Sequence, residues 1–211
     1  MIHPEHDTSH WKWYSWPRFF NRDECLEIGN FIDNNYVGLE DLNLGAKTEG
    51  GITKKKLSSV KHIHYGQIKH LISPIIDEAF FMAQNKFGYL TNGPHDRELL
   101  NFNIYSGESK DTYDWHIDES ANSQEDMKLT LLINLSTEVF EGGDFETWVY
   151  DKRIQPSLAI HGSCFMFKSH IPHRVLPVTK GTRKTLTFWI CTIQIICVSL
   201  YWCSSLTKSF F

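Results

Sequence analysis

The chain has 211 residues, a mass of 24.6 kDa and a formal net charge of -4, with 41% hydrophobic and 22% charged residues. These values predict one globular domain over residues 1–211 and exclude a general electrostatic attraction to nucleic acid. The five cysteines are odd in number and form no Cys-x-x-Cys pair, and the first residues lack the basic start and apolar run of a signal peptide. We therefore expect reduced thiols in a cytoplasmic protein without a membrane span.

The N-terminal part predicts an extended segment followed by a helix. Residues 11–20 are rich in aromatic side chains, which favour a strand that packs on the core. Asn21 is a good N-cap, and Glu24 stands three residues later as in a capping box. The sequence therefore predicts a helix over 21–34.

A loop and a second helix are predicted next. Residues 37–53 carry many Gly, Asn and acidic residues, which favours a loop near a site entrance, and Lys54–Lys56 is interpreted as its solvated continuation. Apolar residues then recur at three- and four-residue steps over 68–87, which predicts an amphipathic helix that Pro74 kinks or restarts. We expect the helical part, 21–90, to support a sheet from outside.

From residue 98 onward the pattern changes to short segments bounded by Gly, Pro, Asn, Asp or Ser. Strands are predicted over 99–105, 113–118, 128–135, 144–150, 163–167, 174–178 and 183–191. Seven strands after two helices predict an α+β protein with a double-sheet jelly-roll core over 98–191. The apolar run 190–200 is interpreted as the end of a buried final strand and a tail, and the sequence leaves the state of residues 191–211 open.

Two polar motifs stand within these predicted strands. His116 and Asp118 are two residues apart, so on one strand they project from the same face. His173 stands ten residues before Arg183 in a segment that reads as strand, turn and strand. Two imidazoles and one carboxylate on one side of a metal leave the other side free, an arrangement that suits non-haem Fe(II). His161 and His170 are alternative third ligands.

The spacing of these residues resembles that of the Fe(II)/2-oxoglutarate-dependent dioxygenases, in the prolyl 4-hydroxylase-like (PKHD-type) branch. The matching motifs are Tyr113-x-x-His116-x-Asp118, Gly142-Gly143-Asp144, His173-x-Val175-x-Pro177-Val178, Arg183, and Tyr105, which Gly107 follows after one residue where the branch has two. Residues 19–26 also resemble the start of that branch. The resemblance implies a double-stranded β-helix.

The resemblance further implies roles for named residues. His116, Asp118 and His173 would be the catalytic metal ligands that hold Fe(II), while Arg183 would bind the far carboxylate of 2-oxoglutarate. Thr187, with Thr185 as a competitor, and Tyr105 would add hydrogen bonds to this cosubstrate. Asn134 is a further candidate contact, and Trp189 is assigned either to the substrate mouth or to the core.

The implied reaction is oxidative decarboxylation of 2-oxoglutarate to succinate and CO2, coupled through O2 to hydroxylation of an unactivated C–H bond, with ascorbate as a supporting reductant. The leading substrate is a protein or peptide, as for a prolyl 4-hydroxylase. The same chemistry on a small molecule, such as a free amino acid or a nucleotide, is the first alternative. A non-catalytic metal-binding jelly roll is the second.

Overall fold

The computed structural model describes residues 11–37, 56–91, 93–119 and 126–192. Its helical elements are α1 (Arg22–Asn35), α2 (Tyr65–Asn85) and the short 3-10 helix η3 (Pro156–Ala159). Its strands are β1 (Trp13–Trp16), β2 (Lys56–Leu57), β3 (Ser59–His64), β4 (Leu99–Ser106), β5 (Thr112–His116), β6 (Asp126–Asn134), β7 (Glu141–Gly142), β8 (Phe145–Trp148), β9 (Lys152–Ile154), β10 (Cys164–Lys168), β11 (His173–Val175), β12 (Val178–Lys180) and β13 (Thr182–Thr192).

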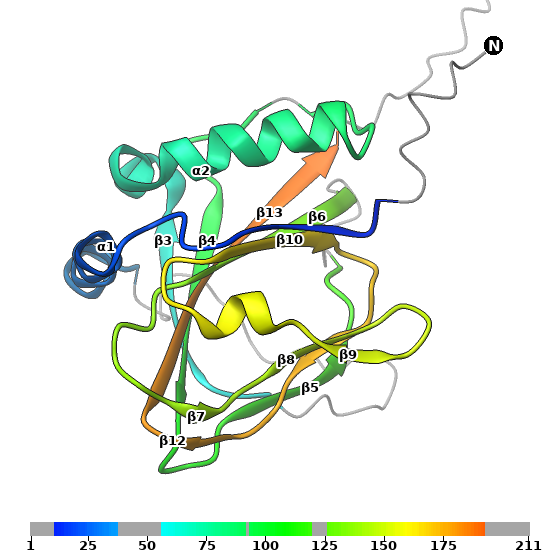
Figure 1. Cartoon of the computed structure of the whole chain (residues 1–211). Helices are drawn as coiled ribbons and strands as arrows, with labels where there is room; N and C mark the ends of the chain where they lie inside the picture. Colours follow the sequence, from blue (N-terminus) through cyan, green and yellow to red (C-terminus); the bar gives the residue numbers. More distant parts are fainter. Residues whose placement is uncertain (1–10, 38–55, 92, 120–125, 193–211) are drawn as a thin grey trace, which may run out of the picture.

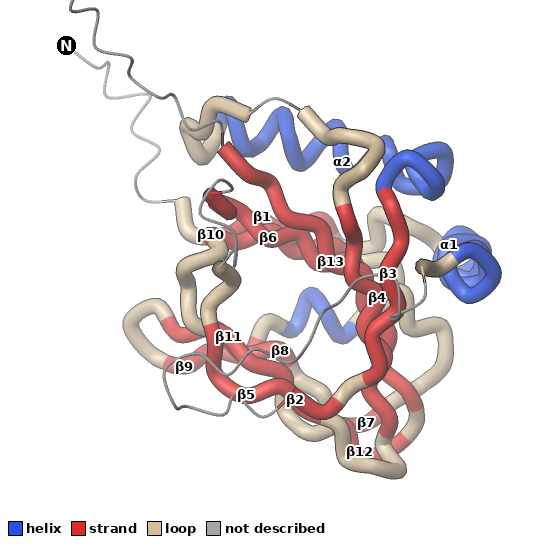
Figure 2. The backbone as a smooth tube through the Cα atoms, turned by 180° about the vertical axis from the view of Figure 1, so that it is seen from behind, coloured by secondary structure: helices blue, strands red, loops and turns tan. Residues whose placement is uncertain are grey.

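The strands form two main antiparallel sheets that face each other (Figures 1 and 2). The larger sheet has the order β1-β10-β6-β13-β4-β3, and the smaller has the order β2-β5-β11-β8-β9. Strands β12 and β7 pair separately at one end. This arrangement is the expected double-stranded β-helix, so the predicted fold class is confirmed. Its division into one domain over the whole chain stays a prediction.

Helix α1 begins where the sequence predicts it to begin. The Asn21 side chain accepts hydrogen bonds from the backbone N–H groups of Asp23 and Glu24, and the Glu24 carboxylate accepts one from the Asn21 N–H at 2.7 Å. These bonds satisfy N–H groups that the first helical turn otherwise leaves unpaired. The helix then buries Cys25, Ile28 and Ile32 beside α2 and β3.

Helix α2 covers the outer face of the larger sheet (Figure 1). Pro74 lies inside the helix without ending it, so the helix does not restart there. A proline costs a helix interior about 3 kcal/mol. Burial of one isoleucine contributes about 1.5–3 kcal/mol, and Ile72, Ile75 and Ile76 beside the proline are all fully buried. Packing on the sheet therefore outweighs the local cost.

Strand β13 separates the core from the interior of the barrel. Its alternate residues Leu186, Phe188 and Ile190 belong to the hydrophobic cluster that contains α2. Arg183, Thr185 and Thr187 project from the opposite face and line a cavity between the two sheets. One strand thus supplies apolar side chains to the core and polar side chains to the site, as the period of two requires.

Several local expectations were wrong or lie outside the described residues. Strands β2, β3 and β9 were not predicted, because each is short or follows a polar stretch and is stabilised by its pairing with β5, β4 or β8. The β5 strand ends at His116 and not at Asp118. The predicted loop 37–53, apart from its first residue, and the tail beyond residue 192 are outside the described residues.

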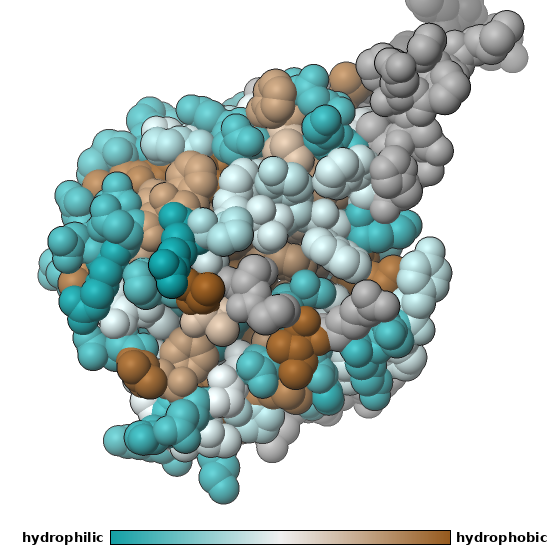
Figure 3. Space-filling model, viewed as in Figure 1, coloured by the Kyte–Doolittle hydropathy of each residue, from teal (hydrophilic) through white to brown (hydrophobic). Residues whose placement is uncertain are grey.

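Two observations concern the surface. Within the described segments, no helix combines the length and apolar character needed to cross a membrane. On the face shown in Figure 3, hydrophobic side chains occur in separate groups among hydrophilic ones.

Neighbouring phenylalanines of α2 provide a test of the packing between helix and sheet. Phe80 is 8% exposed, and its ring centroid lies 6.1 Å from that of Phe188 in an edge-on arrangement. Phe81 is 56% exposed. We expect Phe80→Ala to lower the free energy of unfolding by about 3–5 kcal/mol, because it leaves a cavity against the sheet. Phe81→Ala, the matched control, should change it by about 0.5 kcal/mol or less. Urea unfolding measures both, and equal losses would contradict this account.

Candidate active site

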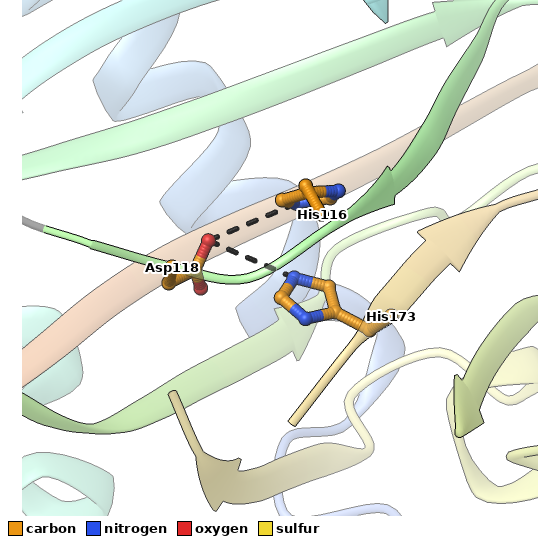
Figure 4. A group of neighbouring side chains, drawn as sticks. All are labelled: His116, Asp118 and His173. Atoms are coloured by element: carbon orange, nitrogen blue, oxygen red, sulfur yellow. Dashed lines mark ion pairs between the residues drawn. The ribbon is translucent and has the colours of Figure 1, made fainter. Parts of the chain in front are cut away.

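Three potential metal ligands converge between the sheets. His116 ends β5, His173 begins β11, and these two residues are directly paired across the two strands. The Asp118 Oδ1 atom lies 3.7 Å from His116 Nε2 and 3.6 Å from His173 Nε2 (Figure 4). One ligand atom from each residue lies within 4.8 Å of the other two. The three predicted ligands therefore come together as the sequence indicated.

Backbone hydrogen bonds set the orientation of both imidazoles. His116 Nδ1 donates to the carbonyl of Asp114 at 2.7 Å, and His173 Nδ1 donates to the carbonyl of Ile171 at 2.9 Å. The proton of each neutral ring therefore lies on Nδ1, and Nε2 keeps its lone pair for a metal. Burial and the neighbouring His173 lower the pKa of His116 to about 3, so this ring is neutral at pH 7.

The two oxygens of Asp118 have different surroundings. Oδ2 accepts hydrogen bonds from Thr130 Oγ1 at 2.7 Å and from Trp189 Nε1 at 3.1 Å. Oδ1 points toward the two histidines. Trp189 therefore has a role that neither prediction described: its indole N–H holds the Asp118 carboxylate in position. Sequence reasoning missed this role, which depends on a contact between residues 71 positions apart.

Aromatic rings enclose the histidines. The Tyr113 ring stacks on His116 with a centroid separation of 3.5 Å, and the Phe167 ring meets His173 at 4.7 Å in an edge-on arrangement. Burial, followed by the charge of Asp118, raises the pKa of Tyr113 to about 12, so its hydroxyl stays protonated. Trp115 lies away from the site, beside Trp148 and Arg174, as strand alternation predicts.

Arg183 is a buried cation at the start of β13. It is 2% exposed, and its Cζ atom lies 5.5 Å from the centre of the Tyr105 ring. Burial raises the pKa of Tyr105 to about 12 although the arginine acts in the opposite direction. Within the described part of the chain, the guanidinium forms no hydrogen bond or ion pair, and Asp144 acts on it only through its charge. A buried guanidinium without a protein acceptor is suited to an anionic ligand.

The triad and Arg183 line one cavity of about 110 Å³ between the sheets. On its larger-sheet wall, Arg183 pairs with Tyr105, Thr185 with Asn103, and Thr187 with Asn101. Thr187 Oγ1 accepts a hydrogen bond from Asn103 Nδ2 at 3.0 Å. The structure thus brings Tyr105, Thr185 and Thr187 to the cavity together, and both threonine candidates for cosubstrate contact remain.

Lys56 also lines this cavity, which corrects the interpretation of residues 54–56 as a solvated loop. Lys56 begins β2, where it pairs with Tyr113 of β5, while Lys54 and Lys55 lie outside the described residues. Its Nζ atom donates to Asn103 Oδ1 at 3.2 Å. The alternation of β2 could not be recognised, because two residues are too few to show a period.

Three other candidates are excluded from the site. Asn134 donates to the carbonyls of Leu158 and Ile160 and accepts from the Ser136 N–H, so it anchors η3 and does not face the cosubstrate cavity. His161 lines a neighbouring cavity of about 340 Å³, which shares Phe145 and Arg183 with the first, and His170 is exposed. Neither histidine belongs to the described group of potential metal ligands.

The donor set fits a divalent first-row metal. Two neutral imidazole nitrogens and one carboxylate oxygen approach from one side, which is the facial arrangement that leaves positions open in non-haem Fe(II) oxygenases. The N–H and O–H groups behind Asp118 and the carbonyls behind the histidines supply the outer hydrogen bonds typical of such sites. His116, Asp118 and His173 are therefore suited to hold iron(II).

Residues 100–191 match the family model of the 2OG-Fe(II) oxygenase superfamily. The chain carries a 2OG-Fe(II) oxygenase domain. This domain is a dioxygenase that uses Fe(II), 2-oxoglutarate and O2, so the predicted enzyme class and cofactors are confirmed, and a non-catalytic jelly roll is not supported. No curated protein sequence matches the chain closely enough to count as a relative.

Solved structures share the fold of the oxygenase at low sequence identity. A prolyl-4-hydroxylase from Pseudomonas putida is 17% identical with a TM-score of 0.63, and covers 89% of this chain and 96% of its own. A prolyl hydroxylase from Trichoplax adhaerens is 16% identical with a TM-score of 0.63 and coverages of 89% and 87%. The viral collagen prolyl hydroxylase of Paramecium Bursaria Chlorella virus-1 is 18% identical with a TM-score of 0.60 and coverages of 89% and 99%.

The hydrogen bond from Trp189 to Asp118 gives a test of the candidate metal site. Trp189→Phe keeps an aromatic side chain but removes the indole N–H that orients the carboxylate, and outer partners of this kind change metal affinity by about 10- to 100-fold. We expect the dissociation constants of the variant for Mn(II), and for Fe(II) measured under anaerobic conditions, to rise by that factor. Trp148→Phe, an exposed tryptophan outside the cavity, is the matched control. Wild-type affinity in Trp189→Phe would contradict the assigned role of the indole.

Proposed function

We propose that this oxygenase hydroxylates a prolyl-type C–H bond in a protein or peptide. The main support is the cavity, in which the ligand triad, with both histidines buried, and a buried arginine without a hydrogen-bonded partner among the described residues lie between the same two sheets. The fold similarity to three prolyl hydroxylases favours this substrate class, and the Trichoplax enzyme was solved in complex with a peptide fragment.

We propose that Fe(II) is held by the Nε2 atoms of His116 and His173 and by one carboxylate oxygen of Asp118. When bound, the iron supplies the redox chemistry that couples decarboxylation of 2-oxoglutarate to hydroxylation of the substrate carbon. The carbonyls of Asp114 and Ile171 accept hydrogen bonds from the Nδ1 atoms of the two imidazoles and so fix the orientation of both rings. Thr130 and Trp189 keep Asp118 turned toward the histidines.

Arg183 is proposed to bind the far carboxylate of 2-oxoglutarate. Its planar guanidinium can donate two parallel hydrogen bonds to a carboxylate, and its burial strengthens them. The Tyr105 hydroxyl, which its raised pKa keeps protonated, adds a donor from the paired position on β4. Thr187 is the favoured hydroxyl partner and Thr185 the alternative. The aromatic rings around the histidines exclude water from the reacting groups.

The first test is the formation of succinate by purified protein supplied with Fe(II), ascorbate, O2 and 2-oxoglutarate, with and without proline-containing peptides. We expect His116→Ala to lose at least about 100-fold in turnover, because one of three ligands is removed. His170→Ala changes an exposed histidine three residues before His173 and should retain wild-type turnover. Full activity in His116→Ala would overturn the assignment of the metal ligands.

A second test concerns Arg183. Arg183→Gln keeps a polar side chain but removes the charge, so we expect the dissociation constant of 2-oxoglutarate to rise by about 10- to 100-fold, the equivalent of a lost charged hydrogen bond. Calorimetry on Mn(II)-loaded protein measures this constant without turnover. Arg174→Gln, which alters an arginine paired with Glu146 outside the cavity, is the control. Unchanged 2-oxoglutarate affinity in Arg183→Gln would reject its role.

Product analysis distinguishes a peptide substrate from a small-molecule substrate. Proline peptides that stimulate succinate formation and gain one oxygen atom by mass spectrometry would establish peptide hydroxylation. If free amino acids or nucleotides stimulate succinate formation and peptides do not, the enzyme acts on a small molecule and the proposed peptide hydroxylation is wrong.

A further inference from the structure

Lys56 is a cation in the oxygenase cavity that the functions proposed above leave without a role. Its Nζ atom lies 4.8 Å from the centre of the Tyr113 ring, and that ring stacks on His116 at 3.5 Å. The two separations, 4.8 Å and 3.5 Å, together place the ammonium within about 8 Å of the centre of the His116 ring. The lysine is therefore close enough to the ligand triad to contact a substrate held there.

Lys56 and Arg183 lie at different positions along the cavity wall. Lys56 donates to Asn103, which pairs with Thr185 and donates to Thr187. Asn103 is two residues along β4 from Tyr105, the partner of Arg183, so at about 3.3 Å per residue these strand positions are about 7 Å apart. Trp189, the next inward residue after Thr187, already contacts Asp118. The ammonium thus lies toward the triad end of the cavity, while the guanidinium lies toward the Tyr105 end.

Among the described residues, the charge of Lys56 has no anionic partner close by. Its one hydrogen bond is to a neutral amide, and no carboxylate of the described residues lies within 4.0 Å of Nζ. Asp118 acts on it only from a longer distance, and the Asp118 oxygens face the histidines, Thr130 and Trp189. Burial lowers the pKa of Lys56, and a bound anion would favour its charged form.

We propose that Lys56, held by Asn103, binds a carboxylate of the substrate to be hydroxylated. This inference rests on the proposed function, because the carboxylates of 2-oxoglutarate are there assigned to Arg183 and to the metal. The substrate carboxylate is either an acidic side chain beside the target residue of a peptide or the carboxylate of a free amino acid. The flexible four-carbon stem of lysine suits a single ionic contact to either source.

The test compares acid and amide forms of the same probe. One probe pair is a proline peptide with Glu or Gln beside the proline, and the other is L-proline and L-prolinamide. Dissociation constants are measured by calorimetry on Mn(II)- and 2-oxoglutarate-loaded protein, which does not turn over. A partly buried charged hydrogen bond predicts an acid preference of about 10- to 100-fold in the wild type. A preference confined to one pair identifies the source of the carboxylate.

Three variants assign the preference to a residue. Lys56→Met keeps the stem and should abolish the preference, and Lys56→Arg should retain most of it. Lys69→Met removes an exposed lysine of α2 that pairs with Asp96, and should preserve the wild-type ratio. The proposal is overturned if the wild type prefers neither acid, or if the preference survives in Lys56→Met. It is also overturned if Lys56→Met weakens 2-oxoglutarate binding as much as Arg183→Gln does, because the lysine would then serve the cosubstrate.

The succinate assay keeps this inference separate from the proposed function. Acid preference that depends on Lys56 in a protein that forms no succinate would overturn the proposed function and leave the carboxylate site standing. Succinate formation that depends on His116, together with equal affinity for acid and amide probes, would support the proposed function and overturn the carboxylate site.

Discussion

The pairing of β11 with β5 is the contact on which the site depends. It places His173 directly opposite His116, although 57 positions separate them in the sequence, and it aligns two imidazoles toward one point. The second edge of β11 pairs with β8, so the short strand is held from both sides by backbone hydrogen bonds. A displacement by one residue would turn His173 to the outer face, where Arg174 now pairs with Glu146. The register of a three-residue strand therefore decides whether a metal site exists.

The ligands are further constrained by groups that do not face the cavity. Backbone carbonyls hold the Nδ1 atoms of both histidines, and the Thr130 hydroxyl and the Trp189 indole hold one oxygen of Asp118. Each bond removes rotational freedom before a metal arrives, which lowers the entropic cost of binding. Asp118 needs this support most, because it lies beyond the end of β5 and lacks the ladder of hydrogen bonds that fixes His116. Its own N–H is held by the carbonyl of Ser169.

Strand β13 links stability to chemistry. Its outward residues complete the hydrophobic core under α2, and its inward residues form a polar wall with β4. The buried apolar face offsets the cost of placing a guanidinium and two threonines inside the protein. The cavity holds two cations at separate positions, with Arg183 near Tyr105 and Lys56 bonded to Asn103.

The sequence by itself determined the class of fold and the helix start at Asn21, because these depend on periodicity and capping. Its motifs also named the three potential metal ligands, whereas the pairing of β11 with β5 brought them together. The motif around His173 singled out the histidine that lies beside His116 and Asp118 in the structure, whereas His161 and His170 lie elsewhere. Tertiary structure decided the helix that continues through Pro74, the place of Asn134 under η3, and the contacts of Lys56 and Trp189 with the site. These features depend on contacts between residues far apart in the chain, and neither a period nor a spacing records which distant side chain will lie opposite.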